Sequence, residues 1–189
     1  MYSIEKMARQ LAKIKEYAIS DEDINKVLQP DTKIFPYPKF GEMETIDEAF
    51  DPLGRCVFLF LTKSETSGHW LMMFKRDAKT IEYFDSYGEK PEAQRQWLPE
   101  EILEHLGQGE PYLMNLLRQS KYRVYYNTVE YQKDKDDINT CGRWALARLI
   151  CKDLSNLEFY NLVRADMKKR GLTQMDDWVA TFTYEMLGK

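Results

Sequence analysis

The fold is decided by residues 56–84, which read CVFLFLTKSETSGHWLMMFKRDAKTIEYF. This stretch contains three short runs rich in apolar, β-branched and aromatic residues: Cys56–Leu61, His69–Phe74 and Thr80–Phe84. Each run has the length of a strand, and the runs are separated by the polar turns Thr62–Ser67 and Asp77–Lys79. Because such short connections cannot hold a crossover helix, residues 56–84 predict a three-stranded antiparallel meander.

The sequence before the meander predicts helices followed by an irregular segment. Residues 3–18 place apolar side chains at helical spacing: Ile4, Met7, Leu11 and Ile14. Ser20–Asp23 fits a capping box that opens a short helix over residues 24–28. Residues 29–53 contain Pro30, Pro36 and Pro38, so we expect them to be mostly irregular.

The sequence after the meander is mainly helical. The expected helices are 99–106, 111–119, 141–152, 156–170 and 174–187. The alternating run Tyr122–Gln132, rich in Tyr and Val, predicts one more strand. A central, mainly antiparallel sheet with helices before and after it predicts an α+β fold.

Length and composition fit one globular domain over residues 1–189. We divide it into N-terminal helices and an irregular segment (1–50), a core (55–150) and C-terminal helices (156–189). Charged residues make up 31% of the chain and the net charge is −4, so no strong basic field is available for nucleic-acid binding. The longest apolar run, Cys56–Leu61, is too short to cross a membrane, and residues 1–6 lack the apolar core of a signal peptide. Three cysteines do not suggest a disulfide framework, so a reducing compartment is expected.

Cys141 lies where a polar loop, Asn139-Thr140, turns into an apolar-periodic helix. A thiol at a helix N-terminus ionises more readily because the unpaired backbone N–H groups there carry partial positive charge. Asn139 and Thr140 are suited to capping this helix, and Gly142 permits close approach of a substrate backbone. The residues expected to face the core are Ala145, Leu146, Leu149 and Ile150. The alternative is a buried structural cysteine, which is our interpretation of Cys56 and Cys151.

The chain has two histidines, so the choice of a general base is narrow. His69 begins a strand after a turn, where its side chain can face a cleft. His105 lies among acidic residues near a helix C-terminus, where a solvated structural role is favoured. In the predicted meander Asp85 ends the strand beside the start of the His69 strand, so it could orient the imidazole. The alternative for Asp85 is a turn residue ahead of Ser86.

An acyl-transfer site also needs donors for an oxyanion. The backbone N–H of Cys141 is one candidate, and a side-chain amide before it is another. Gln132 ends the last predicted strand and Asn139 lies in the loop, so we prefer Gln132 because a strand end is the firmer platform. The alternative for both amides is a polar surface position.

Metal and cofactor chemistry fit the sequence poorly. The cysteines and histidines show no paired zinc-ligand spacing, and no phosphate-binding glycine motif occurs, so we expect no metal and no cofactor. The aromatic run Tyr122–Tyr131 fits a packed strand better than a surface for stacking bases.

The order His69-Trp70, Asp85-Ser86, Gln132, Cys141-Gly142 resembles the adenovirus maturation protease and SUMO-specific protease superfamily of cysteine peptidases. In that superfamily His-Trp, Asp or Glu, Gln and Cys-Gly follow each other in this order. The resemblance covers about residues 55–150 and implies an α+β cysteine peptidase with its nucleophile at the N-terminus of a buried helix. The chain departs from the superfamily pattern in having a longer charged segment between Gln132 and Cys141. It also lacks the long regulatory extension of cellular SUMO proteases. It is therefore more similar to the compact maturation proteases of large DNA viruses and virophages.

Carried over to this chain, the resemblance implies a role for each position. Cys141 would be the nucleophile, His69 the base, Asp85 its orienting partner, and Gln132 with the Cys141 N–H the oxyanion hole. Trp70 and Gly142 would line a narrow substrate channel that accepts Gly or another small residue. The adenoviral enzyme uses DNA as a cofactor, and we do not expect that here because no basic surface is evident.

The resulting expectation is a monomeric cysteine endopeptidase that processes viral capsid or core precursor polypeptides, with no membrane partner. It would act in the host-cell cytoplasm, at the site of viral assembly, or in the virion. Two alternatives remain open: an isopeptidase that removes ubiquitin or SUMO, and a catalytically silent interaction module.

Overall fold

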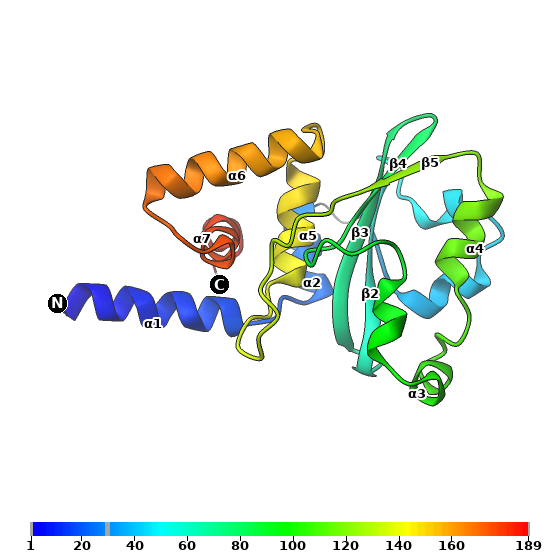
Figure 1. Ribbon diagram of the computed structural model, residues 1–189, viewed down its shortest axis with the longest axis horizontal. Coiled ribbons are helices and arrows are strands. Elements are labelled where there is room, and N and C mark those ends of the chain that lie inside the picture. Colours follow the sequence, from blue (N-terminus) through cyan, green and yellow to red (C-terminus); the bar gives the residue numbers. More distant parts are fainter. Residues whose placement is uncertain (1, 29–30, 189) are drawn as a thin grey trace.

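The chain forms a five-stranded sheet with helices packed on both faces (Figure 1). The computed structural model describes residues 2–28 and 31–188, with side chains from Glu5 onward. The side chain of Ile4, and Pro30, which both entered the predictions above, lie outside this description. The predicted α+β class is confirmed.

The sheet has the strand order β1-β2-β3-β4-β5. The strands are β1 Lys33–Pro36, β2 Arg55–Ser64, β3 Ser67–Asp77, β4 Thr80–Phe84 and β5 Arg123–Tyr126. Strands β2, β3 and β4 form the predicted antiparallel meander. The edge strands β1 and β5 pair with β2 and β4 in parallel. The sheet is therefore mixed, and the expectation of a mainly antiparallel sheet was wrong at both edges.

Two segments differ from the prediction. Residues 29–53 were expected to be irregular but contain β1 and two 3-10 helices, Tyr37–Glu42 and Ile46–Ala49. The predicted strand Tyr122–Gln132 ends at Tyr126. It ends because Asn127 bonds to the strand end opposite: its Oδ1 accepts from the Asp85 N–H (3.0 Å) and its Nδ2 donates to the Asp85 carbonyl (2.7 Å). These bonds take the place of a regular backbone ladder.

The helices follow the predicted order closely. They are α1 Tyr2–Glu16, α2 Asp21–Leu28, α3 Glu100–His105, α4 Tyr112–Gln119, α5 Cys141–Ile150, α6 Asn156–Arg170 and α7 Met175–Leu187, with a 3-10 helix over Ala93–Trp97. The capping box predicted for α2 is present, since Ser20 and Asp23 exchange backbone-to-side-chain hydrogen bonds of 3.2 Å. Local sequence signals therefore located these helices well.

The hydrophobic core is divided between the two faces of the sheet. One face packs against α5, with α2, α6 and α7 grouped around that helix, and the other face packs against α4 and the 3-10 helix Tyr37–Glu42 (Figure 1). Helix α5 is buried from Cys141 to Leu149, and Trp144 stacks on Trp178 with 5.6 Å between ring centroids. Ile150 was expected to be buried, but burial stops at Leu149 and Ile150 at the helix end is 39% exposed.

A buried ion pair joins α5 to the sheet. Arg148 of α5 lies 2.7 Å from Glu82 of β4, and both side chains are at most 1% exposed. Arg76 of β3 also donates to Glu82, at 2.6 Å. The helix that begins at Cys141 and the strand that leads to Asp85 are therefore connected by charge as well as by apolar packing.

Candidate active site

Cys141 is the first residue of α5, and its side chain borders two cavities. The expected side-chain caps are not made. The Thr140 hydroxyl donates to Asp176 instead, and the Asn139 amide donates to the Glu16 carbonyl at 2.9 Å. Because neither side chain caps α5, the positive end of the helix faces the thiol.

His69 and Asp85 meet at one end of the sheet. The register of β3 against β4 pairs Met72 with Phe84, so His69 extends past the end of β4 toward Asp85. The His69 Nε2 lies 2.8 Å from the Asp85 Oδ1, and both side chains are buried. This pairing uses Nε2 and leaves Nδ1 as the ring nitrogen available to Cys141. The meander therefore brings these two residues together, as the sequence predicted.

The pKa values of the thiol and the imidazole move in opposite directions. Burial by itself raises the pKa of Cys141, but a hydrogen bond to His69 and its positive charge outweigh burial, helped by the backbone of Trp70 and Gly142, so the pKa is lowered. Burial by itself lowers the pKa of His69, but the Asp85 carboxylate and the thiol outweigh it and raise the pKa to about 10. The two groups therefore favour a thiolate–imidazolium pair, the nucleophilic form of a cysteine.

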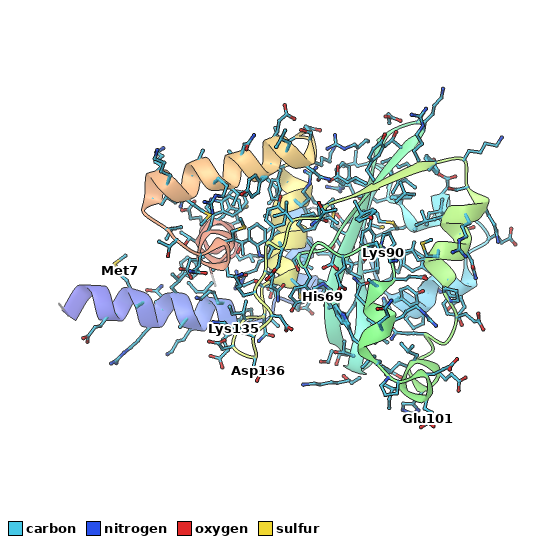
Figure 2. The ribbon with its side chains drawn as sticks, in the orientation of Figure 1. Met7, His69, Lys90, Glu101, Lys135 and Asp136 are labelled. Atoms are coloured by element: carbon cyan, nitrogen blue, oxygen red, sulfur yellow. The ribbon has the colours of Figure 1, made fainter. Side chains whose placement is uncertain are left out.

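Two aromatic rings enclose the imidazole. Tyr87 stacks on His69 with 4.8 Å between centroids and an interplanar angle of 15°, and Trp97 meets it edge-on at 5.3 Å. Figure 2 shows His69 beside the loop that carries Lys135 and Asp136, and these residues line one cavity together. The rings shield one side of the imidazole from water, which strengthens its interaction with Asp85.

Asp85 is held by partners that the sequence did not reveal. Its Oδ2 accepts from the Gln94 Nε2 at 2.6 Å, and its Oδ1 also accepts from the Tyr87 N–H at 2.9 Å. Gln94 is fully buried in the 3-10 helix Ala93–Trp97. Nothing in that segment distinguishes Gln94 from its exposed neighbour Gln96. For Asn127, the break in the alternation of Tyr122–Gln132 is a signal that could have located it.

Gln94→Leu is expected to leave Asp85 less firmly held, because a hydrogen bond to a charged group contributes roughly 1.5–3 kcal/mol. His69 should then favour the thiolate less, so the pH at which Cys141 becomes reactive should rise by up to about one unit. The pH dependence of iodoacetamide alkylation measures this shift. Gln96→Leu, in the same 3-10 helix, is the matched control. Equal alkylation profiles of the two variants would contradict the positioning role of Gln94.

Gln132 lies close to Cys141 but not at a strand end. Its side chain is buried: Oε1 accepts from the Ser86 hydroxyl (2.9 Å), and Nε2 donates to the Ile138 carbonyl (3.1 Å) and the Tyr87 hydroxyl (3.2 Å). It lines the same cavity of about 330 Å³ as Cys141 and His69. The other candidate amide, Asn139, is turned toward α1 by its bond to Glu16.

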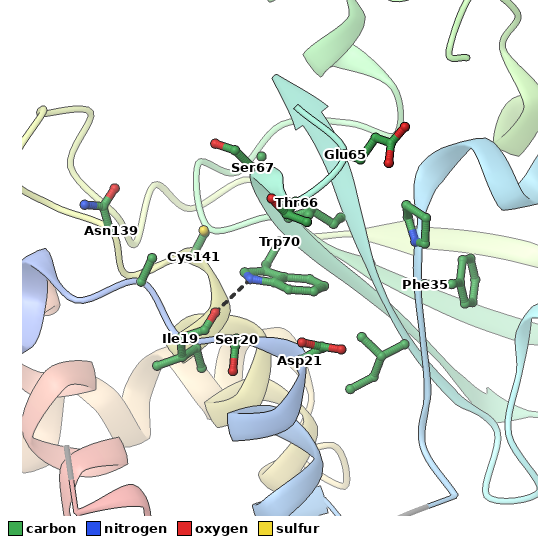
Figure 3. A pocket seen from close by; sticks show the side chains of 15 residues that line it. Ile19, Ser20, Asp21, Phe35, Glu65, Thr66, Ser67, Trp70, Asn139 and Cys141 are labelled. Carbon is green, nitrogen blue, oxygen red and sulfur yellow. Dashed lines mark hydrogen bonds between the residues drawn. The ribbon is translucent and has the colours of Figure 1, made fainter. Parts of the chain in front are cut away.

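A groove of about 450 Å³ extends from Cys141 past Trp70 (Figure 3). The Trp70 Nε1 donates to the Ile19 carbonyl at 3.1 Å, which fixes the indole as a wall of the groove. A Cβ at Gly142 would lie 2.7 Å from the Ile19 Cγ1 and 2.8 Å from the Trp70 Cδ1. Position 142 therefore needs glycine because Trp70 and Ile19 pack directly against its backbone.

The remaining cysteines and histidine lie apart from this site. Cys56 is fully buried in β2, and burial raises the pKa of its thiol. Cys151 follows the last residue of α5, and His105 is exposed at the end of α3. Within residues 2–28 and 31–188, no group of three or more His, Cys, Asp or Glu side chains could hold a metal ion. In the same ranges, no helix is both long enough and apolar enough to cross a membrane.

The fold and the site define a class: an α+β protein whose buried cysteine, at the N-terminus of a helix, lines one cavity with a histidine that is bonded to a buried aspartate. No family model matches the sequence. The chain is 39% identical over 155 residues to "Uncharacterized protein V9" of Sputnik virophage, an alignment that covers 82% of this chain and 88% of that protein. The chain therefore belongs to the same family as this virophage protein.

Proposed function

We propose that the protein is a cysteine endopeptidase of the adenovirus maturation protease and SUMO-specific protease superfamily. The observation that carries the proposal is the position of Cys141 in one cavity with His69, whose imidazole is hydrogen-bonded to Asp85 and lowers the pKa of the thiol. A nucleophile, a base within reach of it and an acceptor that orients the base are the groups that acyl transfer requires. An interaction module without activity has no need for a buried thiolate–imidazolium pair.

The reaction follows from these positions. The Cys141 thiolate attacks the carbonyl carbon of the scissile bond, and the resulting oxyanion accepts hydrogen bonds from the Cys141 N–H and the Gln132 Nε2. The His69 imidazolium then gives its proton to the leaving amine, which departs and leaves a thioester. Neutral His69 takes a proton from water, the hydroxide adds to the thioester, and collapse releases the acid and the thiolate.

Gln132 can serve the oxyanion only by exchanging a partner. Its two N–H groups now donate to Ile138 and Tyr87. The bond to the Tyr87 hydroxyl is the longer of the two, at 3.2 Å, so it is the one expected to be replaced by a substrate carbonyl oxygen. The bonds to Ser86 and Ile138 would keep the amide in place during this exchange.

The kinship with a virophage protein supports a viral substrate. We propose that the enzyme trims capsid or core precursor polypeptides during assembly, in the host-cell cytoplasm or in the virion. Gly142 lies outside the lining of the groove, because Trp70 and Ile19 pack against its backbone, but this packing holds the Trp70 indole beside Cys141. A bulky ring next to the thiol favours Gly or another small residue next to the scissile bond.

Purified protein incubated with the capsid precursor of its own virus is expected to release discrete fragments, with cut sites read by N-terminal sequencing. Iodoacetamide should stop cleavage in proportion to alkylation of Cys141, mapped by mass spectrometry. A Cys151→Ser variant should cleave and be inhibited like the wild type. Rapid labelling of Cys141 by a propargylated ubiquitin or SUMO probe, with the capsid precursor left intact, would instead identify an isopeptidase.

A further inference from the structure

The two cavities beside Cys141 differ in their relation to His69. His69 lines the smaller cavity, which also contains Gln132 and the loop with Lys135 and Asp136. The groove that passes Trp70 includes Cys141 but not His69. The leaving amine belongs to the half of the substrate that follows the scissile bond, and it must receive its proton from His69. We therefore assign this half to the smaller cavity. The half before the scissile bond, which becomes the acyl group, then lies in the Trp70 groove.

The Trp70 groove has an apolar floor and acidic rims. Its apolar lining includes Ile34 and Phe35 of β1 and Leu59 of β2. Asp21 at the start of α2 and Glu65 at the tip of the β2–β3 hairpin line it as well, and Figure 3 shows them on opposite sides of the Trp70 indole. The two carboxylates therefore come from separate elements and line the same groove.

The negative charge of the Trp70 groove is not balanced by the described residues that line it. None of the described side chains that line it is a lysine or arginine. Asp21 and Glu65 are both exposed, and neither is among the described residues that form ion pairs. The smaller cavity differs, because Lys63 and Lys135 line it together with Asp134 and Asp136. Of the two cavities beside Cys141, only the groove assigned to the acyl half of the substrate therefore has an excess of negative charge.

We infer that the acyl half of the substrate carries a lysine or arginine whose charged end lies between Asp21 and Glu65. The apolar stem of such a side chain can pack on Phe35 and Trp70 while its charged end reaches the rims. A glutamate at the same position would face two like charges, so the groove would select against acidic sequences as well as for basic ones. This inference rests on the proposed peptidase function, and it specifies which peptides that peptidase prefers.

The test uses a library of fluorogenic peptides that end in a coumarin amide. Glycine precedes the coumarin in every peptide, and each of the remaining acyl-side positions is varied in turn. At one of these positions, lysine and arginine peptides are expected to have kcat/KM about tenfold above the glutamate peptide, since exposed charge pairs each contribute modestly. In an Asp21→Asn/Glu65→Gln double variant, the lysine-to-glutamate ratio should fall to about one. Glu22→Gln, a neighbouring exposed carboxylate outside the groove, is the matched control and should keep the wild-type ratio.

The outcomes separate the inference from the function on which it rests. Cleavage with equal kcat/KM for lysine and glutamate at every acyl-side position would overturn the inference and leave the peptidase intact. Cleavage of no peptide would count against the peptidase itself. In that case, fluorescence anisotropy with the Cys141→Ala protein still decides the inference, because lysine peptides must bind more tightly than glutamate peptides for the charge assignment to hold.

Discussion

Cys141→Ala and His69→Ala are each expected to lower kcat for peptide cleavage by on the order of 10³–10⁶, the range seen when a member of a catalytic triad is removed. The first variant removes the sulfur that attacks the carbonyl. The second keeps the sulfur but removes the group that ionises it and that gives a proton to the leaving amine. Cleavage by the Cys141→Ala protein at the wild-type rate would show that the nucleophile is wrongly assigned.

A measurement of thiol reactivity tests the role of His69 without a peptide substrate. In the wild type the pKa of Cys141 is lowered and that of His69 is raised to about 10, so the ion pair exists between the two values. Alkylation of Cys141 by iodoacetamide should therefore begin at a pH below that of an ordinary thiol. In His69→Ala the Cys141 thiol stays buried but loses the imidazole that stabilises its thiolate. The pKa of Cys141 should therefore rise, and alkylation should require more alkaline solution.

Cleavage by the wild type should follow a bell-shaped pH profile. It should rise as the Cys141 thiol ionises and fall as the His69 imidazolium loses its proton, with the upper limit near pH 10. His105→Ala is the matched control, because His105 is exposed at the end of α3. Its profile should superimpose on that of the wild type. A profile of His69→Ala that also superimposes would contradict the proposed coupling of thiol and imidazole.

The parts of the site that could be predicted from sequence are those set by local signals and by simple topology. The transition from a polar loop to an apolar-periodic stretch placed Cys141 at the start of a helix. The two short turns in residues 56–84 fixed a meander, and a meander places the end of one strand beside the start of its neighbour. Together these features are sufficient to predict that His69 lies next to Asp85.

The parts that could not be predicted depend on contacts between distant segments. Gln94 and Gln96 are chemically identical, and only the packing of the 3-10 helix against the sheet buries the first and exposes the second. Thr140 was expected to cap α5, but its hydroxyl donates a hydrogen bond to Asp176, which is distant in the sequence. The strand β1 is short, and its pairing with β2 depends on a partner segment that local propensity does not reveal.

The buried pair of Glu82 and Arg148 is the clearest case of such a contact, and it has a large expected effect on stability. Glu82→Ala leaves the Arg148 guanidinium buried without its carboxylate, with carbonyl oxygens of Cys151 and Leu154 as its remaining acceptors. An uncompensated buried charge is strongly unfavourable, so the free energy of unfolding is expected to fall by about 3–5 kcal/mol. Urea denaturation, with the unfolding midpoint and slope compared with those of the wild type, measures this loss.

A surface pair supplies the control for this prediction. Arg170 and Glu185 are 2.8 Å apart, but their side chains are 32% and 58% exposed, so Glu185→Ala should cost at most about 1 kcal/mol. If the loss in Glu82→Ala comes from the unpaired charge rather than from lost volume, the double variant Glu82→Leu/Arg148→Met should recover most of it. A double variant as unstable as Glu82→Ala would assign the loss to packing. Because this pair ties α5 to β4, the double variant also tests whether Cys141 and Asp85 keep their positions once the charge is removed.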